Sequence, residues 1–163
     1  GMVDANIWYE RRAGSKGYDL VGSLGLQRLS LPLGERRLAL DDFATQLTGY
    51  WLPSGEWRLG LQQINAAMKE QKIADVNLAV ASTGFKQPLQ ISMDHLDLAR
   101  LTNMLDSAGA LGEGKLQEIL KTLSPRGQLR NIQLTLPVQQ PKDWQLRANL
   151  DQVAANAWQG VPQ

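Results

Sequence analysis

The sequence predicts an α+β fold that is mainly β: an antiparallel sheet of about eight strands, with two short amphipathic helices against its apolar face. Three observations lead to this prediction. Apolar and polar residues alternate with period two over most of the chain, as they do in a sheet with one apolar face. Turn sequences rich in Gly and Pro separate the alternating segments. One region changes to the longer period of a helix.

The alternation is clearest near the end of the chain. In "DWQLRANLD", Trp144, Leu146 and Leu150 alternate with polar residues, and in "LRNIQLTL", Ile132 and Leu134 do the same. Strands with one apolar and one polar face are typical of antiparallel sheets that expose one face to water. The alternating segments and the turns between them predict strands near 6–12, 18–31, 36–50, 56–65, 73–81, 88–96, 128–137 and 143–152. The alternation changes phase at 26–29 and 40–43, where we expect bulges or corners.

Two segments between the sixth and seventh expected strands have helical spacing. Asp97 is a plausible N-cap for a helix over 98–108, in which Leu98, Leu101 and Leu105 share one stripe. "KLQEILKTL" predicts a second helix over 115–123, which ends at Ser124-Pro125. Each helix has one apolar stripe, and we expect both to cover part of the apolar face of the sheet.

The composition argues against several classes of protein. Seventeen basic and sixteen acidic residues give a net charge of +1 and are scattered, so no basic stripe for nucleic acid is present. The absence of cysteine excludes disulfides and thiol catalysis. No apolar run approaches the ~18 residues of a membrane helix. The length suits one domain, so we treat 1–163 as a single module.

One string resembles a phosphate-binding loop. "GALGEGKL" at 109–116 matches the G-x-x-x-x-G-K pattern, with Lys115 in the lysine position. However, Leu116 replaces the hydroxyl residue that would hold magnesium, and an amphipathic helix precedes the string where a buried strand is required. We therefore interpret the string as a connection between helices and expect no nucleotide cofactor.

No set of residues predicts catalysis. His95 is the only histidine, and with Asp94 and Asp97 it more simply forms a strand end that runs into a helix cap than a metal or acid/base site. Asp41 and Asp42 are adjacent, so their carboxylates would point to opposite faces of a strand. We expect no enzymatic activity, no metal and no cofactor.

The five tryptophans are more informative than these polar residues. They could form sugar-binding platforms, but in a chain with two phenylalanines we expect them to be core anchors. They are Trp8, Trp51, Trp57, Trp144 and Trp158.

Three segments together resemble a known family: "HLDLARLTNML", "LSPRGQLRNIQLTL" and "DWQLRANLDQVAANAWQGVP". In this order they are similar to the large AsmA-like envelope proteins of Gram-negative bacteria, most of all the YhdP family. The matching features are Leu96-Asp97-Leu98 at a strand end, Pro125-x-Gly127 in a turn, and Trp158-x-Gly160-x-Pro162 at the close. "YWLPSGEWRLGLQQI" also resembles a strand–turn–strand unit of the family. The resemblance covers about residues 36–163 with gaps.

The resemblance implies a strongly curved, taco-like sheet in the periplasmic part of a protein that is anchored in the inner membrane. It implies phospholipid transport towards the outer membrane along an apolar groove. The final turn then leads into the next segment of a longer chain, so we expect an internal fragment that contacts neighbouring segments of the same protein.

Two functions remain open. The segment is either part of a lipid-conducting groove, or a structural or partner-docking module of the same envelope protein whose helices fill the groove. If the groove is open, side chains that alternate cleanly near the end of the unit are the candidates for lipid contact. They are Ile132, Leu134, Trp144 and Leu146.

Overall fold

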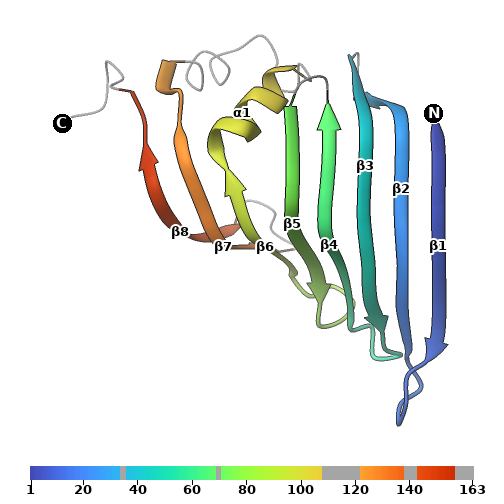
Figure 1. Cartoon of the computed structure of the whole chain (residues 1–163). Coiled ribbons are helices and arrows are strands. Elements are labelled where there is room, and N and C mark those ends of the chain that lie inside the picture. The colour runs from blue at the N-terminus through green and yellow to red at the C-terminus, as the bar shows by residue number, and fades with distance from the viewer. Residues whose placement is uncertain (34–35, 69–70, 108–121, 138–142, 157–163) are drawn as a thin grey trace.

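The protein folds as one antiparallel sheet of eight strands with a single described helix. The computed structural model describes residues 1–33, 36–68, 71–107, 122–137 and 143–156. Each strand pairs with its neighbours in sequence, so β1 and β8 are the two edges (Figure 1). The elements are β1 (Met2–Arg11), β2 (Tyr18–Leu33), β3 (Arg36–Trp51), β4 (Trp57–Met68), β5 (Gln71–Ser82), β6 (Leu89–Asp97), α1 (Leu98–Ser107), β7 (Arg126–Leu136) and β8 (Gln145–Ala154).

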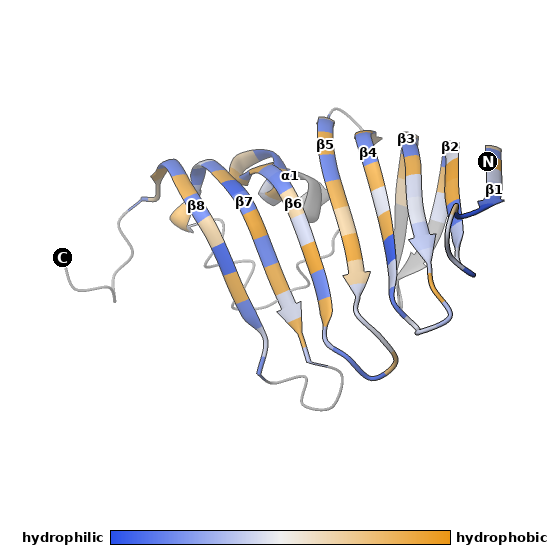
Figure 2. Ribbon diagram, turned by 90° about the horizontal axis from the view of Figure 1, so that it is seen from below, coloured by the Kyte–Doolittle hydropathy of each residue, from blue (hydrophilic) through white to orange (hydrophobic). Residues whose placement is uncertain are grey.

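All eight expected strands are confirmed, and they are antiparallel and mainly one-sided. Bands of hydrophobic and hydrophilic residues alternate along the strands (Figure 2). The main difference in length is at β1, which begins at Met2 where the pattern predicted residue 6. The strong curvature stays a prediction.

Among the described residues, α1 is the one helix longer than a single turn, where two helices were expected. Helix α1 matches the first expected helix, and its N-cap is confirmed because the backbone N–H of Arg100 donates to Asp97 Oδ1 at 2.8 Å. The second expected helix, 115–123, and the "GALGEGKL" string lie almost wholly outside the described residues. Helix α1 contacts β5, β6 and β7.

The alternation changes phase where the backbone adopts a left-handed conformation. Arg28 has φ 51° and lies inside the first predicted slip. The second slip faces the first, because Gln27 pairs with Asp42 and Leu29 pairs with Leu40. Further left-handed residues occur on β4, β5, β7 and β8. They are Gln63, Asp75, Asn131 and Gln152.

Each left-handed residue keeps the apolar side chains on one face although the spacing between them changes from two to three. On β4, for example, Leu61 is followed by Ile64 across Gln63. The pairing register shifts at Gln63 on β4 and at Asn131 on β7, so these two positions are bulges, which increase the local twist of a strand. On β4 and β5, the N–H groups of Gln63 and Asn77 are bound by side chains on the neighbouring strand.

Few side chains of the described residues are buried. The apolar ones are Leu47, Met68 and Val76, at 8%, 4% and 6% exposure. Val76 lies beside α1: a small cavity of about 30 Å³ is lined by Ile73, Val76 and Leu96 together with Arg100 of the helix. A single sheet with one short helix therefore has a thin core, and most of its apolar surface is only half-covered.

The expectation that the tryptophans are core anchors is wrong for three of the five. Trp8, Trp51 and Trp144 are 65%, 43% and 56% exposed. Trp57 is half-buried, and Trp158 lies outside the described residues. A core anchor needs a second layer to pack against, and in the described residues only α1 stands against the sheet.

Candidate functional site

One face of the sheet carries rows of residues that are apolar or glycine. Direct partners in an antiparallel pair lie on the same face, so the register of the seven strand pairs defines the rows. The first row crosses the whole sheet through Tyr9, Leu20, Gly49, Leu59, Val80, Ile91, Leu134 and Leu146. The second row runs from β1 to β7 through Ile7, Gly22, Leu47, Leu61, Leu78, Met93 and Ile132. We call the surface that holds both rows the apolar face.

Much of the apolar face is accessible. Leu59 and Leu146 are 38% and 50% exposed, and Val80, Ile91 and Leu134 are half-buried. Leu47 is the one side chain of the two rows that belongs to the buried apolar core. Exposed apolar areas that extend over several strands are typical of binding surfaces for a protein, a membrane or an apolar ligand.

The four sequence-predicted lipid candidates lie at the β7–β8 end of this face. Ile132 pairs with Met93, and Leu134 lies between Ile91 and Leu146. Leu146 is exposed, and Trp144 lies just before β8 with 56% of its surface exposed. The register therefore brings Ile132, Leu134 and Leu146 together on one surface. Their contact with lipid stays a prediction.

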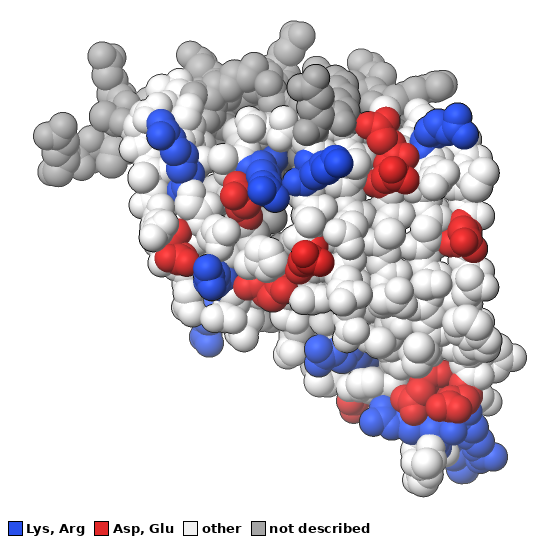
Figure 3. Space-filling model, viewed as in Figure 1, with Lys and Arg blue, Asp and Glu red and all other residues white. Residues whose placement is uncertain are grey.

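The opposite face, which we call the polar face, is more polar, although Trp8 and Val21 at its β1–β2 end are 65% and 56% exposed. Its central row contains Thr48, Gly60, Ala79, Ser92, Gln133 and Arg147 as successive partners from β3 to β8. Basic and acidic groups are interspersed on the surface seen in Figure 3, and no stretch of one sign crosses the strands. The expectation that the sheet binds no nucleic acid stays a prediction.

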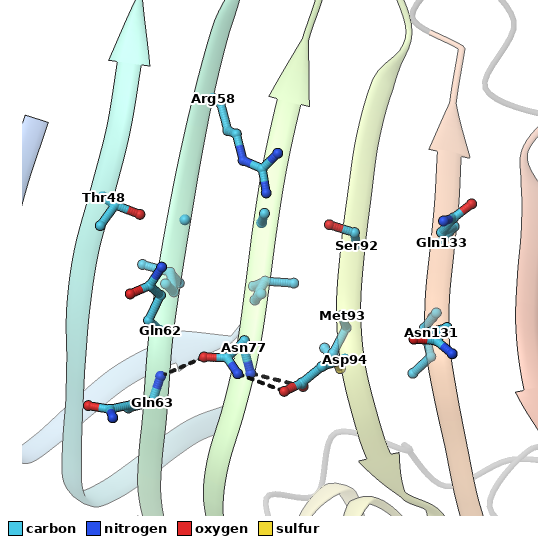
Figure 4. Close-up of a pocket in the computed structure, with 15 residues that line it drawn as sticks. Thr48, Arg58, Gln62, Gln63, Asn77, Ser92, Met93, Asp94, Asn131 and Gln133 are labelled. Carbon is cyan, nitrogen blue, oxygen red and sulfur yellow. Dashed lines mark hydrogen bonds between the residues drawn. The ribbon is translucent and has the colours of Figure 1, made fainter. Parts of the chain in front are cut away.

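A hollow of about 690 Å³ lies on the polar side (Figure 4) and is lined by Arg58, Gln62, Asn77, Asp94 and Gln133 among others. The side chains of Asn77 and Asp94 already accept hydrogen bonds from backbone N–H groups. The N–H of Gln63 donates to Asn77 Oδ1 at 2.9 Å, and the N–H of Asn77 donates to Asp94 Oδ1 at 2.9 Å. The Asn77 amide also donates to Asp94 Oδ2 at 2.7 Å. These two side chains replace ladder bonds lost at the bulges.

The same bonds set the charge state of Asp94. Partial burial by itself would raise the pKa of this carboxyl. The hydrogen bonds from Asn77 and from the backbone of His95, together with the nearby His95 ring, outweigh burial and hold the pKa of Asp94 below its ordinary value. Asp94 is thus a structural acceptor. The described residues hold no group of three or more acidic or histidine side chains able to bind a metal ion.

The sequence pattern predicted Trp51 and Trp57 only as core anchors and did not predict that they gather with Tyr9 and Tyr18 at one end of the apolar face. Tyr18, Trp51 and Trp57 are successive cross-strand partners next to the turns, and Tyr9 contacts Tyr18. The position of these residues could have predicted this. Each lies within two residues of a strand end, where an aromatic ring finds few core side chains to pack against.

Comparison with known proteins gives one match. The family model described as YhdP protein matches residues 1–163. Curated proteins and solved structures give no match. In the part of the chain that the structure describes, no helix has the length and apolar character needed to cross a membrane.

Proposed function

The chain belongs to the YhdP family, and on that premise we propose that the apolar face of its sheet binds phospholipid acyl chains. The segment would be a periplasmic part of a protein anchored in the inner membrane, and it would conduct lipid towards the outer membrane. Family membership is consistent with a bacterial envelope protein. The role is one of binding and guidance, without catalysis.

The observation that supports this proposal is the first apolar row, which crosses all eight strands without a charged residue. An acyl chain needs a continuous apolar surface and no directional partner. The side chains of this row keep part of their surface accessible, with 38% at Leu59 and 50% at Leu146. Each 100 Å² of apolar area covered by a lipid would contribute about 2.5 kcal/mol.

Lipid mass spectrometry tests the proposal. The chain is purified without detergent from Gram-negative cells, extracted and analysed for phospholipid. We expect phospholipid in proportion to protein. Leu59→Asn should reduce it, because the change places an amide on the apolar row. Ser92→Asn is the matched control on the polar face and should leave the amount unchanged. Wild-type protein free of phospholipid would contradict the proposal.

A second function, a structural or docking module of the same envelope protein, is favoured by helix α1. The helix contacts β5, β6 and β7, and Val76 beside it is buried. Here the apolar face is covered by protein, as a filled groove requires. The two functions would use different parts of the sheet. The ends of β5, β6 and β7 next to α1 would have a structural role, and the apolar rows that α1 does not cover would bind lipid.

A further inference from the structure

One end of the apolar face differs in chemistry from the rest. Towards the β1–β2 and β3–β4 turns, its aliphatic rows give way to Tyr9, Tyr18, Trp51 and Trp57, which we call the aromatic end. The rings of Tyr9 and Tyr18 meet edge to face with centroids 6.3 Å apart, and those of Tyr18 and Trp51 stack at 6.5 Å. Tyr9, Tyr18 and Trp51 are 76%, 45% and 43% exposed.

Tyrosine and tryptophan rings of this kind suit the boundary between an apolar surface and water. Their rings are apolar, and their O–H and N–H groups need a polar partner. In membrane proteins the same two residues gather at the level of the lipid headgroups. The aromatic end would therefore contact the glycerol and ester region of a phospholipid whose acyl chains lie on the aliphatic rows.

Basic side chains follow the aromatic end. The β1–β2 turn surrounds an open hollow of about 630 Å³, lined by Arg11, Arg12 and Lys16 with the small residues between them. Arg12 pairs with Asp19 at 3.5 Å and lies 4.6 Å from the ring centroid of Tyr50. Arg11 and Lys16 are exposed. These two cations have the charge that a lipid phosphate requires.

The turn that presents these cations is ordered. The N–H of Arg12 donates to the carbonyl of Gly17 at 3.0 Å, and the N–H of Gly17 donates to Ser15 Oγ at 3.0 Å. Gly14 has φ 73°, a conformation that glycine adopts without strain. These hydrogen bonds hold the backbone of the turn next to the aromatic end.

The dimensions match a phospholipid. At about 3.3 Å per residue, Arg11 stands about 7 Å from Tyr9 along β1. This is close to the thickness of the polar region of one bilayer leaflet, about 5–8 Å. In the other direction, β2 offers about 26 Å of strand between Tyr18 and Leu26. The hydrocarbon of one leaflet needs about 15 Å.

We propose that the aromatic end and the β1–β2 turn form a headgroup site, in which Arg11 and Lys16 bind the phosphate of a phospholipid and Tyr18 and Trp51 contact its ester region. The site rests on the proposed function, because the acyl chains occupy the apolar face. It adds a fixed orientation of the lipid: headgroup at the turns, acyl chains running towards the other end of the sheet.

The first test compares two soluble probes, dihexanoyl phosphatidylglycerol and dihexanoyl glycerol, by calorimetry. We expect the phosphate-containing lipid to bind more tightly. The double variant Arg11→Gln/Lys16→Gln should weaken its binding about 25-fold, since each cation near an anionic lipid contributes about five-fold, and should leave the binding of dihexanoyl glycerol unchanged. Arg147→Gln, on the polar face, is the matched control and should have no effect.

The outcomes separate the two proposals. If neither lipid binds, the proposed function fails. If both bind equally, or if the double variant binds as the wild type does, the acyl surface stands and the headgroup site is overturned. Inorganic phosphate is the third probe. If it binds alone as tightly as the phospholipid, the turn is a site for a free anion, and the lipid assignment is overturned.

The second test measures orientation by fluorescence quenching with brominated phospholipids. Variants that keep one tryptophan, with the others changed to phenylalanine, report single positions. Trp51 should be quenched more by bromine near the ester end of the acyl chain than by bromine near its methyl end. Trp8 pairs with Val21 on the polar face and should be quenched by neither. Equal quenching of Trp51 by both lipids would overturn the orientation.

Discussion

A charge placed on the apolar face distinguishes a lipid-binding surface from a packed core. Leu146 on β8 is 50% exposed and pairs with Leu134. Full burial of a leucine side chain is worth about 1.5–3 kcal/mol, so Leu146→Asp forfeits about half of that, roughly 1 kcal/mol. The poor strand preference of Asp adds up to about 1 kcal/mol. Because the carboxylate keeps contact with water, we expect a total loss of about 1–2 kcal/mol and a folded protein.

Leu47→Asp is the matched comparison on the same face. Leu47 is 8% exposed, so the new carboxylate would be buried without a partner, at a cost above about 4 kcal/mol. The assay combines urea unfolding with lipid mass spectrometry. Leu146→Asp should stay folded, with an unfolding free energy about 1–2 kcal/mol below that of the wild type, and lose bound phospholipid, whereas Leu47→Asp should unfold. Equal destabilisation by the two changes, or full lipid retention in folded Leu146→Asp, would refute the reasoning.

Three further changes test single contacts, and a fourth tests the "GALGEGKL" string. Asn77→Ala should cost roughly 1–3 kcal/mol in urea unfolding, because it removes the acceptor for the N–H of Gln63 and a donor to a charged carboxylate; no loss would show that the bulge needs no side-chain partner. Asp94 has a folded pKa below its ordinary value of 3.8, so its contribution is present above that pH and is lost as the pH falls through the lower folded value. Asp94→Asn should therefore flatten the acid-induced loss of stability below about pH 4, and an unchanged profile would contradict this. Asp97→Ala should speed amide exchange at the start of α1 and cost about 1 kcal/mol, since the cap to Arg100 is lost. Calorimetry of the wild type and of Lys115→Ala should detect no tight magnesium-dependent ATP binding, because Leu116 replaces the hydroxyl residue.

The strands could be predicted because their signal is local. The alternation around Leu59 or Leu134 follows from the face of the sheet to which each residue points, so it can be read from a few neighbouring residues. All eight strands predicted in this way are present. The phase change near Arg28 was also visible, since Leu26 and Leu29 cannot share a face in a regular strand.

The bulges on β4, β5 and β7 were harder to predict. Gln63 is not a glycine and has no intrinsic preference for a left-handed backbone, whereas Asn131 and Asp75 are of residue types that adopt this conformation more often but not regularly. The conformation of Gln63 is supported across the sheet, because the Asn77 side chain on β5 binds its N–H and Asp94 on β6 in turn binds Asn77. Such support depends on register, which the pattern alone does not give.

The tryptophans show the same limit. A large apolar side chain predicts burial only where a second layer exists, and the sequence of a strand does not reveal whether its face is covered. Trp51 is exposed on the apolar face because the described helix lies over β5–β7 and away from β3. The aromatic end likewise depends on the pairing of Tyr18 with Trp51.

Photo-crosslinking across the sheet tests the lipid-binding surface most directly. A photoreactive amino acid is placed at Leu59 or Leu146 on the apolar face, and at Ser92 or Gln133 on the polar face, in protein expressed in the envelope of a Gram-negative cell. Irradiation followed by intact-mass analysis should give phospholipid adducts at Leu59 and Leu146 and none at Ser92 and Gln133. Adducts at equal levels on both faces, or protein adducts alone at Leu59 and Leu146, would contradict a lipid-binding apolar face.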